Sequence, residues 1–334
     1  MEEDLRVFQI IDQLHLRAFR NSFPGLPIRS WSQSGSDFEL HVPKENEAFY
    51  DSEYYYKGEL QFFHITPIRN LFSILNERAI RMYDLHSSAD PEEYSYAAKI
   101  LGLSESSIEN RKRYYFTFSF CPIVELRNKQ IWDSYGDNNE GSAAIVFELL
   151  NDPRDWIRYH ISEIKYGSPG SFETYRESTR EIEIQHSHMG ISLHCDLSRL
   201  IGFHKAKHWE GEKEVRIASY IPFDDLEEGE KFTKLEWRFS AGRKRYTKYL
   251  QLPVWVDNDS SWVRSFVKPE WDRTRPLPKG FYDTRPMIKI KGIHIHPNTK
   301  LTGQEYFALQ GKLCENFRLN YGYDVEMDIN LFRI

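Results

Sequence analysis

The stretch LQFFHITPIRNLFSIL at residues 60–75 decides the fold expected for this chain. Its first half is rich in aromatic and β-branched residues, which is typical of a strand. From Pro67 onward the apolar residues recur at helical spacing, and Thr66 and Pro67 are residue types favoured at the start of a helix. The sequence therefore predicts a strand that turns directly into a helix over residues 67–77, with His64 just before the turn.

This turn is also the first candidate binding site. The free N–H groups and the positive dipole end of a helix bind anions, so we expect a phosphate group near Thr66, with Arg69 one turn into the helix. His64 would then lie beside a sugar attached to that phosphate. The alternative is a core histidine bonded to a backbone carbonyl.

The rest of the chain predicts an α+β protein, because strand and helix signals follow one another in mixed order. Residues 1–58 are expected to form an N-terminal extension with a helix over 4–20, residues 59–334 the main domain, and residues 222–286 an inserted hairpin and long loop. Further strands are expected at 113–121, 142–149, 160–166 and 213–221, two or three more within 230–256, helices at 171–187 and 196–208, and a β-α-β end around a helix at 303–319.

An aromatic turn provides a second candidate site. Trp132 and Tyr135 precede the polar turn at 136–141 and the expected buried strand at 142–149. A ring at this position could stack on a planar ligand, or it could belong to the core. Ser119, in the preceding strand, could bond the same ligand or line the sheet.

The third candidate site is EKEVR at 212–216. On a strand, Glu212, Glu214 and Arg216 would share one face. Such a set is usually a surface ladder of ion pairs. Beneath a groove, one carboxylate can stabilise positive charge that develops at a ribosyl carbon while the other orients the attacking group, and Arg216 can adjust their pKa values or hold a phosphate. Together the three sites suggest NAD chemistry.

These stretches resemble ADP-ribosyltransferases. FFHITPIRNLFSIL is similar to the first strand and helix of the DarT-type DNA-modifying toxins, and IWDSYG, KHWEGEKEVR and IKGIHIHP are similar to a widespread bacterial family of unassigned function. The resemblance covers residues 60–220 and 288–315. It implies split mixed β-sheets with flanking helices, NAD as the substrate and no metal. It also implies a toxin or phage-defence role, with a possible antitoxin or immunity partner.

The resemblance assigns roles to individual residues. It implies that His64 contacts the ribose, that Tyr135 stacks on nicotinamide and that Glu214 is the catalytic glutamate. Glu212 and Ser119 are similar to a second transferase class, which begins with Arg in place of His. The residues expected at the site are therefore Glu214 and Glu212 for catalysis, and His64, Thr66, Arg69, Ser119, Trp132, Tyr135 and Arg216 for NAD.

Two other activities stay open at this point. Asp155, Glu163 and Lys165 fit the loose pattern of Mg²⁺-dependent nucleases, and a fold that binds a nucleotide without reacting is a further alternative. Metal sites are less favoured, because the spacing of the candidate ligands matches no standard zinc site. These ligands are His186, His188, His194 and Cys195, with His204 and His208 as a separate pair.

Charge and cysteine content bear on partners and compartment. The net charge of −6 requires no polyanionic partner, but residues 231–248 combine basic and aromatic side chains. Such a run is more often the solvated face of a hairpin; as a binding surface it favours nucleic acid over protein as the acceptor. The three cysteines are far apart and odd in number, which suits a reducing compartment. The N-terminus lacks the features of a signal peptide and no apolar stretch approaches bilayer length, so we expect a cytoplasmic protein with no membrane partner.

Overall fold

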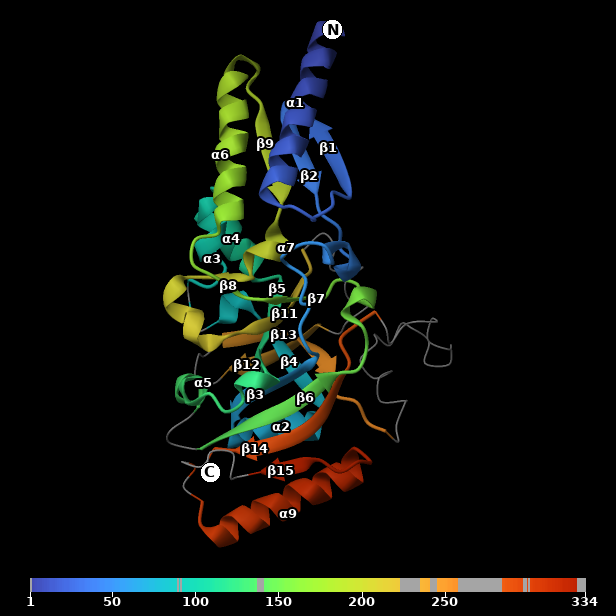
Figure 1. Ribbon diagram of the computed structural model, residues 1–334, viewed down its shortest axis with the longest axis vertical. Helices are drawn as coiled ribbons and strands as arrows, with labels where there is room; N and C mark the ends of the chain where they lie inside the picture. The colour runs from blue at the N-terminus through green and yellow to red at the C-terminus, as the bar shows by residue number, and fades with distance from the viewer. Residues whose placement is uncertain are drawn as a thin grey trace.

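The computed structural model describes residues 2–88, 90, 92–136, 141–222, 235–240, 245–257, 284–296, 299 and 301–328. This part of the chain is a mixed α+β protein, as the sequence predicts (Figure 1). The helices are α1 (Glu2–Ser22), α2 (Ile68–Glu77), α3 (Ser95–Ile100), α4 (Glu105–Lys112), α5 (Lys129–Tyr135), α6 (Gly170–Gln185), α7 (Ser198–Ile201) and α9 (Gly303–Asn320). Short 3₁₀ turns include η2 (Leu85–Ser87), η4 (Pro153–Asp155) and η6 (Lys207–Glu212).

One large mixed sheet forms the body of the described chain. Its strands run in the order β12-β13-β4-β5-β3-β6-β14-β15. Strand β11 also pairs with β5, and β7 pairs with β11. Their bounds are β3 (Gln61–Pro67), β4 (Ala79–Asp84), β5 (Tyr115–Pro122), β6 (Ser142–Leu149), β7 (His160–Glu163), β11 (Val215–Tyr220), β12 (Leu235–Ser240), β13 (Arg245–Pro253), β14 (Ile288–Ile295) and β15 (Glu326–Asp328). A parallel pair, β8 (Lys165–Tyr166) with β10 (His204–Lys205), lies outside this sheet.

Strand β5 is the centre of the sheet, and its two edges are paired differently. β11 pairs along one edge from Tyr115 to Phe120. On the other edge, β4 pairs only with Phe116 and Thr117, and β3 pairs only with Cys121 and Pro122. The two neighbours therefore part beside residues 118–120, which have no strand partner on this edge within the described chain. This open edge positions the candidate site.

The two faces of β5 differ beside the open edge. Phe118 and Phe120 point into the main core, where α2 and α9 cover the sheet with Leu71, Leu75 and Phe317. Successive side chains of a strand alternate between faces, so Thr117 and Ser119 point the other way. These hydroxyls are only partly buried. β5 therefore has an apolar face toward the core and a polar face toward the site.

The start of α2 differs from the predicted capped turn. Thr66 and Pro67 still belong to β3, where they pair with Ala143 and Ser142 of β6. Pro67 occupies the cap position without a side-chain cap, and the N–H of Ile68 donates to the carbonyl of Gly141 at 3.3 Å. The prediction that Thr66 caps the helix is therefore wrong, because strand pairing extends through the turn.

Residues 1–58 do not stand apart as an extension. β1 (Ser30–Ser34) and β2 (Asp37–His41) form a three-stranded sheet with β9 (Ser192–Asp196), which lies far along the chain. Helix α1 packs beside α6, and Phe38, Ile182 and Leu193 share one small core. Figure 1 shows these elements as a layer projecting from the main sheet. The expected boundary near residue 58 therefore divides one packed unit.

Several other expectations can be compared with the structure. The strands at 113–121 and 142–149, the helix at 171–187 and the β-α-β end are confirmed within a few residues. The helix predicted over 196–208 is wrong, because only residues 198–201 are α-helical before β10 and η6 begin. Of the expected insertion at 222–286, residues 223–234, 241–244 and 258–283 lie outside the described residues, and β12 and β13 form the predicted hairpin. Within the described chain, no helix combines the length and the apolar character needed to cross a membrane.

Candidate functional site

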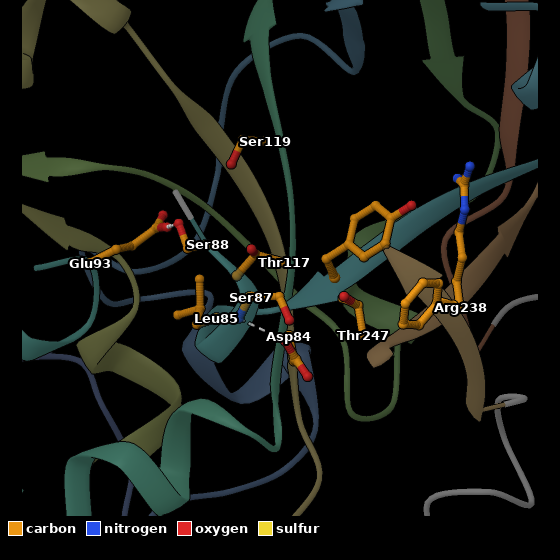
Figure 2. Close-up of a pocket in the computed structure, with 11 residues that line it drawn as sticks. Asp84, Leu85, Ser87, Ser88, Glu93, Thr117, Ser119, Arg238 and Thr247 are labelled. Carbon is orange, nitrogen blue, oxygen red and sulfur yellow. Dashed lines mark hydrogen bonds between the residues drawn. The ribbon is translucent and has the colours of Figure 1, made fainter. Parts of the chain in front are cut away.

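A cavity of about 580 Å³ lies along the polar face of β5, and we call it the large lobe (Figure 2). Thr117 and Ser119 of β5 line it. Figure 2 shows Ser88 and Glu93 on one side and Arg238 of β12 on the other. The lining residues are Tyr83, Asp84, Leu85, Ser87, Ser88, Glu93, Thr117, Ser119, Arg238, Phe239 and Thr247.

A second cavity of about 240 Å³, the small lobe, continues from the first one. The two lobes adjoin, because Tyr83, Thr117, Ser119 and Arg238 line both of them. The small lobe reaches His64 and Thr66 on β3, and Asn70 and Ser73 on α2 contribute further polar groups. The combined space is within the range of sites that bind small organic ligands, roughly 300–1,000 Å³.

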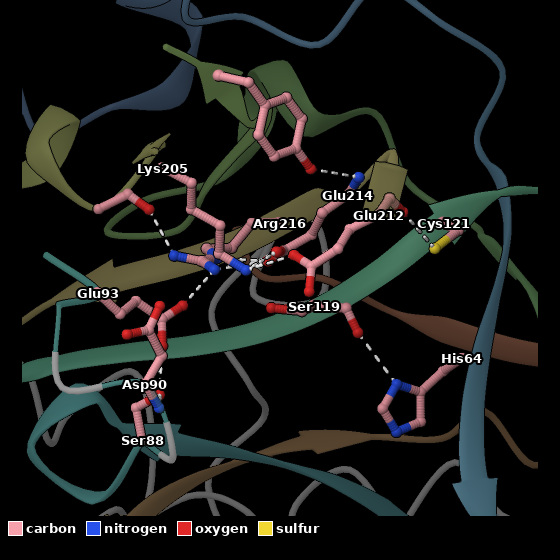
Figure 3. A network of polar contacts seen from close by, with 12 residues as sticks. His64, Ser88, Asp90, Glu93, Ser119, Cys121, Lys205, Glu212, Glu214 and Arg216 are labelled. Carbon is pink, nitrogen blue, oxygen red and sulfur yellow. Dashed lines mark hydrogen bonds and ion pairs between the residues drawn. The ribbon is translucent and has the colours of Figure 1, made fainter. Parts of the chain in front are cut away.

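His64 closes the open edge of β5. Its Nδ1 lies 3.0 Å from the carbonyl oxygen of Ser119, in the part of β5 that no strand pairs on this side (Figure 3). Burial lowers the pKa of His64, although the bond to Ser119 opposes this effect. A neutral ring that donates from Nδ1 has an acceptor at Nε2. His64 can therefore receive a hydrogen bond from a ligand hydroxyl in the small lobe.

Glu214 lies directly before β11, next to Ser119. Its carboxylate accepts from Nε of Arg216 at 2.8 Å and from Nζ of Lys205 at 2.5 Å. Burial alone would raise the pKa of Glu214, but Arg216, Lys205 and the Ser119 hydroxyl outweigh it and hold the pKa below its ordinary value. Glu214 is therefore an ionised carboxylate whose side chain is 1% exposed.

Arg216 is a buried structural cation. Its guanidinium donates to the carbonyl of Gly202 at 2.5 Å and pairs with both Glu214 and Glu93. With the side chain 0% exposed and its groups engaged, Arg216 does not reach the cavity as a phosphate ligand. The expectation that it could bind a phosphate is therefore wrong.

Sequence reasoning missed Glu93. One carboxylate oxygen of Glu93 accepts a hydrogen bond from Arg216, and the other accepts one from the hydroxyl of Ser88. The available signal was Arg216 itself, since a guanidinium in the apolar strand VRIASY needs more than one carboxylate to be buried. Nothing in the sequence marks which distant glutamate supplies the second.

Glu212 joins the site by a different route from the predicted strand alternation. It ends η6, and Lys213 follows in the left-handed region with φ of 48°. Lys205 lies 2.7 Å from Glu212 and so bridges it to Glu214. Tyr135 of α5 hydrogen-bonds Glu212, and burial together with the charges of Glu214 and Glu212 raises its pKa far above the ordinary value. Lys205, which sequence reasoning did not select, therefore holds Glu212 and Glu214 together.

Tyr135 also borders a small side pocket of about 80 Å³. His64 and Ser119 line the same pocket, together with apolar groups of β3 and β5. The structure therefore brings His64, Ser119, Tyr135 and the two glutamates into one connected set, drawn from separate elements.

Two of the residues expected to bind NAD lie elsewhere. Trp132 is 1% exposed, belongs to an apolar cluster, and donates its indole N–H to the carbonyl of Leu126 at 2.7 Å. Its ring has no open face on which a ligand could stack. Arg69 is exposed on α2 and is absent from the lining of the cavities described above. Thr66 lines the small lobe from β3.

The residues of the alternative sites lie on separate elements. Asp155 is on η4, Glu163 is exposed at the end of β7, and Lys165 belongs to β8. Within the described chain, no three acidic, histidine or cysteine side chains form a group that could hold a metal ion. His204 is instead buried and bonded to the Tyr54 hydroxyl at 3.0 Å.

The hairpin of β12 and β13 carries the described part of the basic and aromatic stretch. Trp237, Phe239 and Tyr246 are 56%, 52% and 67% exposed. Lys248 lies 5.1 Å from the ring centre of Trp237 and 4.4 Å from that of Tyr114. Residues 231–234 and 241–244 of the stretch lie outside the described residues. The hairpin places exposed rings directly beside the large lobe, because Phe239 also lines that lobe.

Compared with protein families, with curated proteins and with solved structures, the chain matches none of them.

Proposed function

We propose that the protein is an ADP-ribosyltransferase, which binds NAD along the open edge of β5 and cleaves the bond between nicotinamide and ribose. The observation that carries the proposal is the meeting of His64, Ser119 and Glu214. They come from β3, from β5 and from the residue before β11. His64 and Ser119 line a cavity of dinucleotide size, and Glu214, which does not line it, is hydrogen-bonded to the hydroxyl of Ser119. The parting of β3 and β4 also agrees with the split mixed sheets that the resemblance implies.

The proposed chemistry depends on the charge of Glu214. Cleavage of the nicotinamide–ribose bond leaves positive charge on the ribosyl carbon, and a fixed carboxylate in a site of low dielectric stabilises that charge. The lowered pKa of Glu214 keeps it ionised at neutral pH. His64 accepts from a ribose hydroxyl, and Tyr135 lines the side pocket, which suits the nicotinamide ring.

Lys205 has a defined part in this proposal. Its ammonium group contacts one oxygen of Glu214, and it also contacts Glu212. When the ribose approaches, Lys205 stays with Glu212 and releases Glu214. Glu212 thereby keeps the cation in place and can orient the acceptor.

Nucleic acid is the acceptor that the hairpin favours. Exposed aromatic rings and cations are the groups on which single-stranded nucleic acids stack and bind, and Trp237, Phe239 and Lys248 supply them next to the large lobe. A toxin or phage-defence role, with an antitoxin partner, follows from the resemblance and belongs to the same proposal.

The test measures nicotinamide release from NAD by chromatography. Glu214→Gln keeps the shape of the side chain and removes its charge, so turnover should fall by on the order of 10²–10³-fold while NAD still binds. Glu163→Gln, an exposed carboxylate outside the site, is the matched control and should keep wild-type turnover. Full activity in Glu214→Gln would contradict the proposal.

A non-reacting nucleotide-binding module is the second candidate. It is favoured by the engagement of both Glu214 oxygens with Arg216 and Lys205 and by the 1% exposure of the side chain. On this reading the wild type binds NAD and releases no nicotinamide at any enzyme concentration, and the same assay separates the two candidates.

A further inference from the structure

We infer that Arg238, on the hairpin of β12 and β13, binds the diphosphate of the dinucleotide. The inference rests on the proposed function for its ligand, and it concerns a residue outside the expected NAD site. The large and small lobes of the cavity meet at Tyr83, Thr117, Ser119 and Arg238.

A dinucleotide has two nucleoside halves joined by a diphosphate. When one half occupies each lobe, the diphosphate lies where the lobes meet. Arg238 is the cationic side chain at that junction, and the other three residues there offer hydroxyl groups. A guanidinium has the fork geometry that suits two phosphate oxygens.

The charges on the walls agree with this position. Asp84 and Glu93 are the carboxylates that line the large lobe, and Figure 2 shows Glu93 on the side opposite Arg238. Glu93 is already engaged by Arg216 and Ser88. We therefore place the diphosphate nearer to Arg238 than to Glu93.

Arg238 is also the cation that is available. Arg81 lines the small lobe but pairs with Glu77 and lies 5.0 Å from the ring centre of Tyr249. Arg238 has no ion pair or hydrogen bond with any other described residue, and its side chain is exposed. The start of α2, which the sequence favoured for the phosphates, has its first N–H bonded to Gly141.

The experiment measures the affinity of the full chain for ADP-ribose by calorimetry at low and high salt. Arg238→Gln should weaken binding by about 10- to 100-fold, the range for losing a hydrogen bond to a charged group. Its affinity should also fall less steeply with salt than that of wild type. Arg238→Lys, which keeps the charge, should recover part of the loss.

Lys99→Gln is the matched control, because it removes an exposed cation of α3 that does not line either lobe. It should bind ADP-ribose within about twofold of wild type, a difference of under 1 kcal/mol. Wild-type affinity in Arg238→Gln, or equal losses in Arg238→Gln and Lys99→Gln, would overturn the inference.

The result is separable from the proposed function. If wild type releases nicotinamide but its ADP-ribose affinity does not depend on Arg238, only the diphosphate assignment is wrong. If ADP-ribose binding depends on Arg238 but no nicotinamide is released, the diphosphate assignment stands and the transferase is wrong.

Discussion

At the scale of single residues, the site combines groups that the sequence could suggest with groups that it could not. His64 and Ser119 were predictable as candidates because each is a polar residue in a strand pattern, and Glu214 because it shares a strand face with Glu212 and Arg216 in EKEVR. Lys205 and Glu93 were not, because their roles depend on which distant charge each meets. Trp132 was selected for the site but lies in the core, because an aromatic residue near a polar turn is equally compatible with either place.

The role of His64 gives a prediction at this scale. His64→Ala removes the acceptor in the small lobe and should weaken NAD binding by roughly 1–3 kcal/mol, the effect of leaving a ligand hydroxyl unpaired. Calorimetry on the folded variant measures the change. His41→Ala, an alteration of a histidine of β2 outside the cavities, should leave the affinity unchanged. Unchanged NAD affinity in His64→Ala would remove His64 from the site.

At the scale of elements, local pattern identified most strands of the sheet but not the turns between them. β5 and β6 were predictable because they are continuous alternating or apolar runs. The start of α2 was not, because Thr66 and Pro67 suit a helix start by type but are held in β3 by pairing with β6. Likewise, a helix was expected over 196–208, but β10 and the start of η6 occupy residues 204–208, and Glu212, expected on a strand, ends η6.

The turn before α2 can be tested by a substitution at Gly141. It has φ of 80°, its carbonyl accepts from Ile68 of α2, and an added Cβ would lie 2.3 Å from Cγ2 of Thr299. Gly141→Ala should therefore lower the free energy of unfolding by more than the roughly 1–2 kcal/mol expected for a left-handed residue alone.

Gly35→Ala supplies the matched measurement, because Gly35 has φ of 62° and nothing within 4 Å of an added Cβ. Chemical denaturation of both variants gives the difference. Equal losses of stability would show that the contact between the turn and residue 299 contributes nothing.

At the scale of the whole molecule, the α+β class was predictable from the order of elements, but the partition of the chain was not. The N-terminal residues pair with β9 and pack on α6, and a pairing between segments so far apart leaves no local signal. The shape of the cavity has the same origin. It needs the parting of β3 and β4 beside β5, together with a hairpin from far along the chain.

Two buried histidines predict that the stability of the protein depends on pH. His15, bonded to Tyr175, and His204, bonded to Tyr54, are buried, and burial lowers their pKa values to about 4 and about 3. Because these folded-state values are below the ordinary value of about 6.5, the unfolded chain binds protons first as the pH falls. The free energy of unfolding should have its full value above pH 6.5 and should be lower at pH 5 by about 2 kcal/mol for each histidine.

Urea denaturation at pH 7.5 and pH 5 measures this change. His204→Gln should lose part of the pH dependence, whereas His188→Gln, at an exposed histidine that follows α6, should keep all of it. A wild-type stability that does not change between the two pH values would contradict neutral burial of these histidines.

The central claim is that NAD lies along the open edge of β5, and a crystal structure with a non-cleavable NAD analogue tests it most directly. We predict a ligand hydroxyl within hydrogen-bonding distance of Nε2 of His64, the diphosphate at Arg238, and the ribosyl carbon facing Ser119 and Glu214. An analogue bound away from His64 and Ser119, or no binding at concentrations that saturate the protein in solution, would contradict the account.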